Sequence, residues 1–341
     1  MTLINAKRFS EITDKFPSLE PICVCGDVGI DKYTLGEVRR ISPEAPVPIL
    51  EVKEERLILG MSANISNNLK TLGMDSTLSA VIGNDQRATR FESLLEEINL
   101  KTWGLIRDPS RPTIYKERIS TNTQQICRID YEDLSPLNSE SEKKLLNRVE
   151  DFAKSHSALI VEDYSKGTLT KNVLRRSIDV FRDAGKLVAV DPGRQTAPEC
   201  YSGASLIKPN LLEARQMMEH LGYTYQQKSL EEMAVILSDK LNIPQIVITL
   251  GKDGMAMFDR AQSSTLTIIP TVAQEVYDVS GAGDTTISLL VASLLAGASL
   301  EEATWIANCG AGVVVAKKGT ATVNLFELQE FYHRLSRRYS K

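Results

Sequence analysis

Cysteine and histidine are both scarce in this chain of 341 residues, which contains five cysteines and three histidines. No two cysteines form a Cys-x-x-Cys pair and the histidines are widely scattered, so the sequence offers no zinc site. Cys23 and Cys25 alternate within an apolar segment, and we interpret them as buried hydrophobic residues. This use of cysteine is typical of a reducing compartment, and we expect a cytoplasmic protein.

The chain also lacks an excess of positive charge and a long apolar run. Lysine and arginine together number 40 against 44 aspartates and glutamates, and no long basic run is present. The net charge of −4 therefore argues against nucleic acid as a partner. The longest apolar stretch, residues 287–298, is too short to span a bilayer and contains serine, so we expect no membrane association.

Residues 1–20 lack the apolar segment of a secretory signal and carry Glu11 and Asp14. Apolar side chains in this segment are spaced as on one face of a helix, and they are Phe9, Ile12, Phe16 and Leu19. We therefore predict a short lead-in helix within residues 1–20. At the other end we expect a frayed tail over residues 333–341.

Two common nucleotide-binding signatures are absent. Gly251-Lys252 is followed by Asp253, so the chain has no GxxxxGK[ST] loop. The turn after the first predicted strand, residues 26–29, reads Gly-Asp-Val-Gly and is not GxGxxG. P-loop and dinucleotide-binding interpretations, including a dehydrogenase, therefore lose support.

Most of the chain alternates between predicted strands and helices. With 42% hydrophobic residues it can bury one large core. We predict strands at residues 21–25, 77–82, 158–161, 187–190, 206–207, 246–249 and 255–258, and helices at residues 62–72, 87–98, 141–155, 171–184, 211–221, 230–241 and 286–297. This alternation predicts an α/β domain over residues 21–332, with helices on both faces of a parallel sheet.

Two further regions are rich in strand-forming residues and contain no helical pattern. They cover about residues 30–59 and 113–131. Thr121-Asn122-Thr123 interrupts the second region and resembles a hairpin turn. We predict that both regions form a small separate sheet inserted into the main domain.

The most informative stretch is residues 278–285, where a glycine-rich loop leads into a predicted helix. Free backbone N–H groups and the helix dipole make such a junction an anion site, and Gly281, Ala282 and Gly283 would let a phosphate approach closely. An aspartate repels an anion, so Asp284 is better explained as a base that takes the proton of an attacking hydroxyl. The alternative is a capped helix in which Asp284 only favours the dipole.

Polar residues follow almost every predicted strand, as expected where ligands bind at the carboxyl ends of a parallel sheet. Among them, Asn210 opens a helix and Glu213 follows three residues later. This spacing fits a capping box. It equally fits a pair that holds a hydrated Mg²⁺ beside nucleotide phosphates.

Residues 278–285 resemble the C-terminal signature of the ribokinase (PfkB) superfamily of sugar and nucleoside kinases. The resemblance covers about residues 21–328 and includes Gly26-Asp27…Asp31, Gly60…Asn64, Asn210-x-x-Glu213, Thr249-Leu250-Gly251…Gly254 and Asn308. A closer similarity is to bacterial D-glycero-β-D-manno-heptose 7-phosphate kinases. It rests on the run Arg-Ile-Ser-Pro-Glu-Ala-Pro-Val-Pro at residues 40–48, on Gln124-Gln125, and on residues 163–167 and 273–279.

The resemblance implies a Rossmann-like domain with a β-sheet lid, and phosphoryl transfer from ATP to the anomeric hydroxyl at C1 of heptose 7-phosphate. The product would be the 1,7-bisphosphate, a precursor of envelope heptose and of ADP-heptose. In some bacteria a nucleotidyltransferase domain follows on the same chain. Because this sequence ends before such a domain, we expect a stand-alone kinase.

The resemblance also implies roles for individual residues. Asp284 would be the base, with Gly281, Ala282 and Gly283 as the anion hole. The ATP side would comprise Asn210, Leu211, Leu212, Glu213, Thr249, Gly251, Gly254 and Asn308, with Asn210 and Glu213 at Mg²⁺. The sugar side would comprise Asp31, Gly60, Asn64 and Asp163. The backbone near Asp278 would bind a monovalent cation.

For the phosphate that the sugar itself carries, the candidates are cations of the predicted lid and of the loop after residue 161. They are Arg39, Arg40, Lys116, Arg118, Arg128 and Lys166. For each lid cation the alternative is a solvated charged face. The mixed polar and apolar faces of the lid also predict a homodimer through the lid sheets.

Three departures from the heptose kinases concern the pocket. Met61 stands where the family usually has a second glycine, and residues 249–251 are closer to ribokinases at large. Gly193 replaces the lysine of an Asp-Pro-Lys motif, and Arg194 is a candidate substitute. A kinase for another sugar or sugar phosphate, or a nucleotide-binding regulator without catalysis, therefore stays open.

Overall fold

The core of the protein is a nine-stranded sheet with the strand order β13-β12-β11-β10-β9-β8-β1-β4-β5. The computed structural model describes residues 3–262 and 265–339. The strands are β1 (Ile22–Gly26), β4 (Ser76–Ile82), β5 (Leu105–Arg107), β8 (Ala158–Glu162), β9 (Leu187–Asp191), β10 (Leu206–Ile207), β11 (Gln245–Thr249), β12 (Met255–Asp259) and β13 (Thr267–Ile269). Pairing is parallel from β5 to β11 and antiparallel for β12 and β13. The predicted α/β fold is confirmed, with an antiparallel edge that the sequence pattern did not predict.

The chain reverses its direction of growth between β1 and β8. From β1 it moves outward to β4 and β5, then crosses back to β8 and continues through β9, β10 and β11. Such a reversal leaves a crevice beyond the carboxyl ends of the two strands, where ligands of open α/β sheets bind. Asp27 follows β1 and Asp163 follows β8 at this place.

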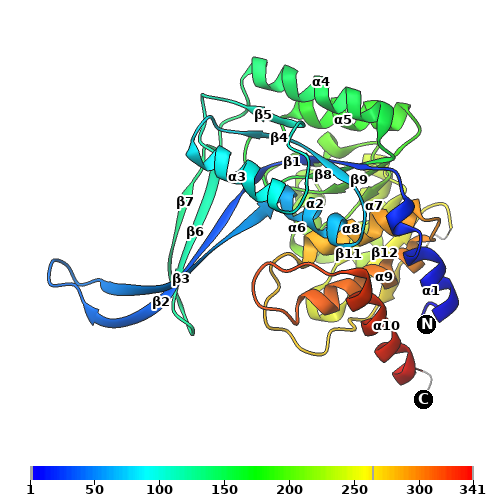
Figure 1. Cartoon of the computed structure of the whole chain (residues 1–341). Helices are drawn as coiled ribbons and strands as arrows, with labels where there is room; N and C mark the ends of the chain where they lie inside the picture. Colours follow the sequence, from blue (N-terminus) through cyan, green and yellow to red (C-terminus); the bar gives the residue numbers. More distant parts are fainter. Residues whose placement is uncertain (1–2, 263–264, 340–341) are drawn as a thin grey trace.

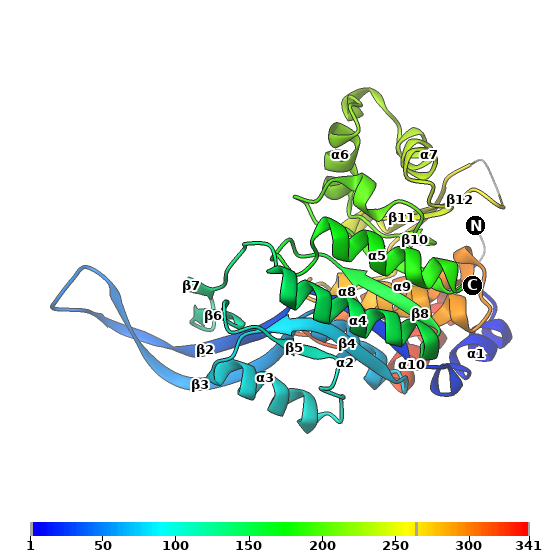
Figure 2. The same ribbon diagram turned by 90° about the horizontal axis from the view of Figure 1, so that it is seen from above.

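Helices cover both faces of the sheet (Figures 1 and 2). One face packs against α1 (Ala6–Thr13), α2 (Ser62–Thr71), α3 (Gln86–Glu97), α8 (Ala282–Leu295), α9 (Leu300–Val314) and α10 (Leu325–Tyr339). The other packs against α4 (Ser139–Ser155), α5 (Lys171–Asp183), α6 (Leu211–His220) and α7 (Leu230–Leu241). Successive side chains of a strand alternate between the two cores, so Val24 enters the first while Cys23 and Cys25 enter the second. All three side chains are fully buried, which confirms the interpretation of the two cysteines.

Several helices begin at residues whose side chains satisfy free backbone N–H groups. Ser229 and Ser299 each accept from the residue three positions later, and Glu232 and Glu302 complete the two capping boxes. Asp85 caps α3 in the same way. Within residues 3–262 and 265–339, no helix has both the length and the apolar character that crossing a bilayer requires.

The two ends of the described chain pack together. The lead-in helix forms as α1, followed by a 3₁₀ turn at Phe16–Ser18, and the ring of Phe9 stacks on Tyr332 of α10 with centroids 3.9 Å apart. Helix α10 continues to Tyr339, so residues 333–339 are helical rather than a frayed tail. Residues 340–341 lie outside the described part of the chain.

A separate four-stranded sheet, the lid sheet, projects from the main sheet (Figure 1). Its strands are β2 (Val28–Ile41), β3 (Pro48–Met61), β6 (Ile114–Ser120) and β7 (Gln125–Tyr131), in the order β3-β2-β6-β7. Strand β2 starts directly after Asp27, so the lid sheet is a continuation of the central strand β1. The predicted turn at residues 121–123 connects β6 to β7, with the Thr121 N–H donating to the Gln124 carbonyl at 2.8 Å.

Candidate active site

Helix α8 begins at the glycine loop, four residues earlier than the sequence pattern predicted. Gly281 is its N-cap residue with φ 80°, a left-handed conformation that favours glycine. A Cβ atom at Gly281 would lie only 2.9 Å from the Asn64 amide nitrogen. Among the described residues, no side chain caps this helix end. The first turn, Ala282 to Asp284, therefore presents backbone N–H groups at an anion-binding helix terminus.

Asp284 lies in that first turn and is 5% exposed. Its carboxylate accepts hydrogen bonds from Asn64 Nδ2 at 2.6 Å and from the Tyr164 hydroxyl at 3.2 Å. Burial raises the pKa of Asp284, although the Asn64 hydrogen bond and the Lys208 charge oppose this. A buried carboxylate with a raised pKa is a better proton acceptor than an exposed one. Because Gly281 occupies the N-cap position, Asp284 is not the cap of this helix.

The loop after β8 is held by Asp27, whose side chain is fully buried. The carboxylate accepts from the backbone N–H groups of Tyr164 at 3.2 Å, Lys166 at 3.0 Å and Thr168 at 3.1 Å. Asp163, expected at the sugar, accepts instead from Ser165 N, Thr196 and Tyr201. Its carboxylate therefore supports the loop that brings Tyr164 to Asp284.

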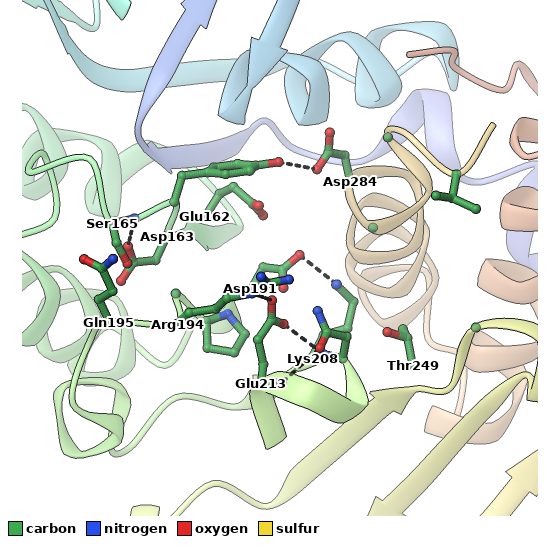
Figure 3. A pocket seen from close by; sticks show the side chains of 18 residues that line it. Glu162, Asp163, Ser165, Asp191, Arg194, Gln195, Lys208, Glu213, Thr249 and Asp284 are labelled. Carbon is green, nitrogen blue, oxygen red and sulfur yellow. Dashed lines mark hydrogen bonds and ion pairs between the residues drawn. The ribbon is translucent and has the colours of Figure 1, made fainter. Parts of the chain in front are cut away.

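Three buried charged groups stand side by side at the carboxyl ends of β8, β9 and β10 (Figure 3). Lys208 Nζ lies 2.7 Å from Asp191 Oδ2, and Glu162 lies beside Asp191. Burial alone would lower the pKa of Lys208. The nearby charges of Asp191 and Glu162 have the larger effect, so the pKa of the lysine is raised. Sequence reasoning missed both Lys208 and Glu162. Their positions at strand ends next to Asp163 and Asn210 are the signal that could have identified them.

Asn210 and Glu213 form a true capping box on α6. Asn210 Oδ1 accepts from Glu213 N, and Glu213 Oε2 accepts from Asn210 N, both at 2.9 Å. The second carboxylate oxygen, Glu213 Oε1, lies 3.6 Å from Arg194 Nε. Burial raises the pKa of Glu213. The capping interpretation is thus realised, and one oxygen of Glu213 remains directed toward a cation.

A cavity of about 590 Å³ brings these groups together. Its lining includes Asp191, Lys208, Asn210, Glu213, Thr249, Gly251, Gly281, Gly283 and Asp284. Figure 3 shows that the acidic groups and Lys208 surround one space, with Asp284 at the start of α8. Leu211 and Leu212 do not line it: Leu211 packs against the core, and Leu212 is exposed.

A second cavity, of about 430 Å³, adjoins the first and shares Thr249, Gly251, Val279 and Gly283 with it. Its other walls are mainly apolar and include Met255, Ala311 and Val315, together with the predicted residues Gly254 and Asn308. Asn308 Nδ2 donates to the Pro270 carbonyl at 2.7 Å, which fixes one wall. A polar cavity joined to an apolar one suits a triphosphate joined to a purine base.

The opposite side of Asp284 carries the residues expected at the sugar. Asn64 contacts Asp284 directly. A Cβ atom at Gly60 would lie 2.9 Å from Asp31 Oδ2, so a side chain there would crowd that carboxylate. Asp31 Oδ1 accepts from Arg118 Nη1 at 2.6 Å. The fold therefore brings Asp31, Gly60, Asn64 and Arg118 to one side of the base.

The remaining candidate cations fall into two groups. Lys116 and Lys166 both pair with Glu132, at 3.4 and 2.7 Å, and lie partly buried where β6 faces the loop after β8. Arg39 and Arg40 lie exposed near the outer end of β2, which projects away from the main sheet (Figure 1). The exposed Arg128 pairs with Asp130 on its own strand. Arg39 and Arg40 thus lie away from Asp284, whereas Arg128 stands directly opposite Arg118 in the register of β6 and β7.

Residues 28–325 match the pfkB family of carbohydrate kinases, which is most of the chain. The chain belongs to this family. It is 39% identical over 310 residues to the bifunctional protein HldE of Aliarcobacter butzleri, covering 91% of this chain and 64% of that protein. With the bifunctional protein HldE of Wolinella succinogenes it shares 40% over 319 residues, covering 93% and 65%. The kinase chain thus spans just under two thirds of the length of these curated relatives.

Solved structures of carbohydrate kinases share the fold at low sequence identity. The ribokinase of Arabidopsis thaliana, complexed with ribose and ATP, superimposes with a TM-score of 0.70 at 18% identity, covering 92% of this chain and 98% of that one. Phosphofructokinase-2 from Escherichia coli, in complex with substrates and products, gives 0.76 at 18%, covering 94% and 100%. These likenesses confirm the α/β fold with its lid sheet.

The structure shows the local surroundings of two of the departures from the heptose kinases in this pfkB-family chain. Met61 has φ 59°, so this kinase keeps a methionine in a conformation that favours glycine, at an estimated cost of about 1–3 kcal/mol. At Gly193, a Cβ atom would lie 2.5 Å from Ser165 Oγ, so a side chain there would require Ser165 and Asp163 to shift. Lys208 supplies a buried cation beside Asp191 instead, while Arg194 lies more exposed at Glu213.

We predict that Asp284→Asn folds and binds ATP but lowers kcat by about 10²–10⁴-fold, because an amide cannot accept the proton of a hydroxyl. Removing a negative charge beside the phosphates should leave ATP affinity equal or higher. kcat, the ATP dissociation constant and a melting curve on one preparation test this. Glu232→Gln is the matched control, because it removes a carboxylate from the same position of α7 without touching the cavity. A variant that keeps more than about a tenth of the wild-type kcat would contradict a role as base.

Proposed function

We propose that this kinase transfers the γ-phosphate of ATP to the C1 hydroxyl of D-glycero-β-D-manno-heptose 7-phosphate and forms the 1,7-bisphosphate used for ADP-heptose. The single observation that carries a transfer reaction is Asp284, buried between the nucleotide-sized cavities and the Asp31–Asn64 side. The heptose assignment is supported by 39–40% identity to the HldE proteins and by the run at residues 40–48. Because those relatives are longer and bifunctional, their complete activity is not assigned to this chain.

The geometry supports a direct transfer. Asp284 would accept the proton of the attacking hydroxyl, and Asn64 and Tyr164 would hold its carboxylate in place. The first turn of α8 would receive the phosphoryl oxygens through its backbone N–H groups. Lys208 would offset negative charge on the phosphates from the other wall. Positioning and charge neutralisation are the main contributions that phosphoryl transfer needs from a protein.

The donor set near Glu213 fits Mg²⁺ bound together with ATP. Among the described residues, no group of three or more His, Cys, Asp or Glu side chains is arranged to hold a metal alone. One carboxylate oxygen, water and phosphate oxygens are sufficient for Mg²⁺, which keeps much of its hydration. Glu213 Oε1 is such an oxygen, because it already faces a guanidinium. The metal would neutralise phosphate charge.

Two finer assignments extend this proposal. A monovalent cation would bind the backbone near Asp278. The carboxylate of Asp278 accepts hydrogen bonds from the backbone N–H groups of Ser280 at 2.9 Å and Gly319 at 3.1 Å, which fixes this part of the chain. A dependence of kcat on potassium concentration would test the site. A cytoplasmic location is supported by five free cysteines, four of them buried. Finding the folded protein in a disulfide-forming compartment of the cell would contradict this location.

The substrate assignment predicts that heptose 7-phosphate has a higher kcat/KM than ribose, fructose 6-phosphate and adenosine. Coupled ADP release with each compound, at fixed ATP and Mg²⁺, measures this. Met61 and Gly193 favour one alternative, a different sugar phosphate, and a higher kcat/KM for fructose 6-phosphate would select it. Preference for adenosine or an unphosphorylated sugar would overturn the proposal. ATP binding without turnover of any substrate would indicate a regulator.

Arg118→Ala tests whether the lid binds the sugar's phosphate. A hydrogen bond to a charged group contributes about 1.5–3 kcal/mol, so KM for the sugar phosphate should rise by at least about tenfold while KM for ATP stays the same. Arg39→Ala is the matched control, since that guanidinium also pairs with a carboxylate but lies far out on β2. KM for unphosphorylated heptose is measured as well, because it would rise if the loss of Arg118 disturbs Asp31 but not if only phosphate binding is lost. An unchanged KM for the sugar phosphate would return Arg118 to a structural ion pair.

The lid sheet is also the proposed homodimer interface. Exposed apolar side chains gather on its outer hairpin and include Val38, Ile41, Val47 and Val52, and such groups are typical of association surfaces. We expect the mass of a dimer by sedimentation, and a monomer after Val52→Lys. Thr89→Lys, a charge added on the exposed part of α3, is the control. A wild-type monomer at micromolar concentration would contradict the interface.

A further inference from the structure

Glu162, Asp191 and Lys208 form a row across three neighbouring strands. The parallel register places Glu162 directly opposite Asp191, and Ile207 opposite Val190, so Lys208 comes next to Asp191. All three residues are at least nine-tenths buried, with exposed fractions of 4%, 9% and 3%. Their side chains line the 590 Å³ cavity, on the wall that faces Asp284 (Figure 3).

The hydrogen bonds in this row leave one oxygen without a donor. Asp191 Oδ2 is taken by the ammonium of Lys208 at 2.7 Å. Glu162 Oε2 is buried and has no donor among the described residues, although the register places Glu162 directly opposite Asp191 on the neighbouring strand. Two carboxylate oxygens can share a hydrogen bond only when one of them carries a proton.

The surrounding charges indicate which carboxyl carries it. Glu162 faces Asp191, Asp284 and the Tyr164 hydroxyl, and the cation with the largest effect on it is Lys208. That ammonium pairs with Asp191 Oδ2. Burial, followed by the negative charges of Asp191 and Asp284, raises the pKa of Glu162 well above its usual value. Asp191, bonded to Lys208, is the better-compensated carboxylate.

We propose that Glu162 is protonated in the native kinase and is a positioning residue, whose hydrogen bond to Asp191 holds the Lys208 ammonium toward the phosphates. The role as a positioning residue rests on the proposed kinase function, whereas the protonation does not. Asp191 is then fixed from both sides, by the Glu162 carboxyl and by Lys208. The ammonium has three N–H donors, so two remain for phosphate oxygens.

An ionised Glu162 would change the cavity in two ways. It would compete with Asp191 for Lys208 and pull the ammonium toward β8. It would also add a further negative charge, next to Asp191 and Asp284, in a cavity that has to admit a triphosphate. Gly193, which also lines the cavity, has no side chain that could offset that charge. The shared proton therefore leaves the Lys208 ammonium free to donate hydrogen bonds to the phosphates.

Chemical denaturation of wild type and Glu162→Gln tests the protonation without any turnover. A proton bound by Glu162 in the folded chain is released on unfolding above about pH 5, where an unfolded glutamate is ionised. The contribution of Glu162 to wild-type stability then falls as pH rises, and glutamine, which keeps a donor for Asp191, lacks this dependence. The ratio of the unfolding constants, wild type over variant, should grow by about tenfold per pH unit between pH 5 and pH 7.

Glu302→Gln is the matched control. Glu302 is held ionised by its hydrogen bond with Arg8, which lowers its pKa, so its ratio should stay constant above pH 5. A ratio that is equally constant for Glu162→Gln would show that Glu162 is ionised and would overturn the proposal.

Positioning is tested by comparing Glu162→Gln with Glu162→Ala. Alanine removes the hydrogen bond to Asp191, and a misplaced group costs about ten- to hundredfold in kcat. Glutamine should restore kcat to within about threefold of wild type, with KM for the sugar phosphate unchanged in both variants. Equal kcat values for alanine and glutamine would refute positioning. If alanine does not fold, a glutamine kcat as low as a tenth of wild type refutes it. A wild type without turnover would count against the kinase function and leave the denaturation result valid.

Discussion

Removing carboxylates from water is the constraint on which this site depends. Asp27, Glu162, Asp191 and Asp284 are all buried near the carboxyl ends of the central strands or at the start of α8. An ionised carboxylate without partners is strongly disfavoured in such a place. Asp27 receives three backbone N–H groups, Asp191 receives an ammonium, and Asp284 receives an amide and a hydroxyl. The elements that supply these donors are thereby fixed in position around one cavity.

This arrangement explains how acidic residues and a polyanionic substrate can share a site. The cavity wall carries more carboxylates than cations, so affinity for phosphates has to come from elsewhere. The first turn of α8 supplies backbone dipoles, Lys208 supplies a charge, and a metal bound with the nucleotide would supply another. Asp284 can therefore remain close to the reacting groups without preventing nucleotide binding.

Much of the fold follows from local sequence signals, whereas the site required spatial information. The buried apolar strands and the strand–helix alternation predicted the sheet, and the Gly-Ala-Gly-Asp stretch located α8. Its true start at Ala282 depends on the left-handed conformation of Gly281, which periodicity alone does not reveal. Short edge strands such as β13 give too few residues for a pattern. Lys208 and Glu162 were missed because their meaning arises only from the register of β8, β9 and β10.

The continuity of β1 with β2 has a mechanical consequence. The lid sheet is attached to the core at Asp27, and the same residue anchors the backbone that carries Tyr164. Asp27 thus lies at the base of the lid sheet and also holds in place the residue whose hydroxyl contacts Asp284. A rotation of the lid sheet large enough to open the sugar side would strain the hydrogen bonds between Asp27 and the backbone at Tyr164. Such a rotation of the lid sheet would therefore also disturb the Tyr164 hydrogen bond to Asp284.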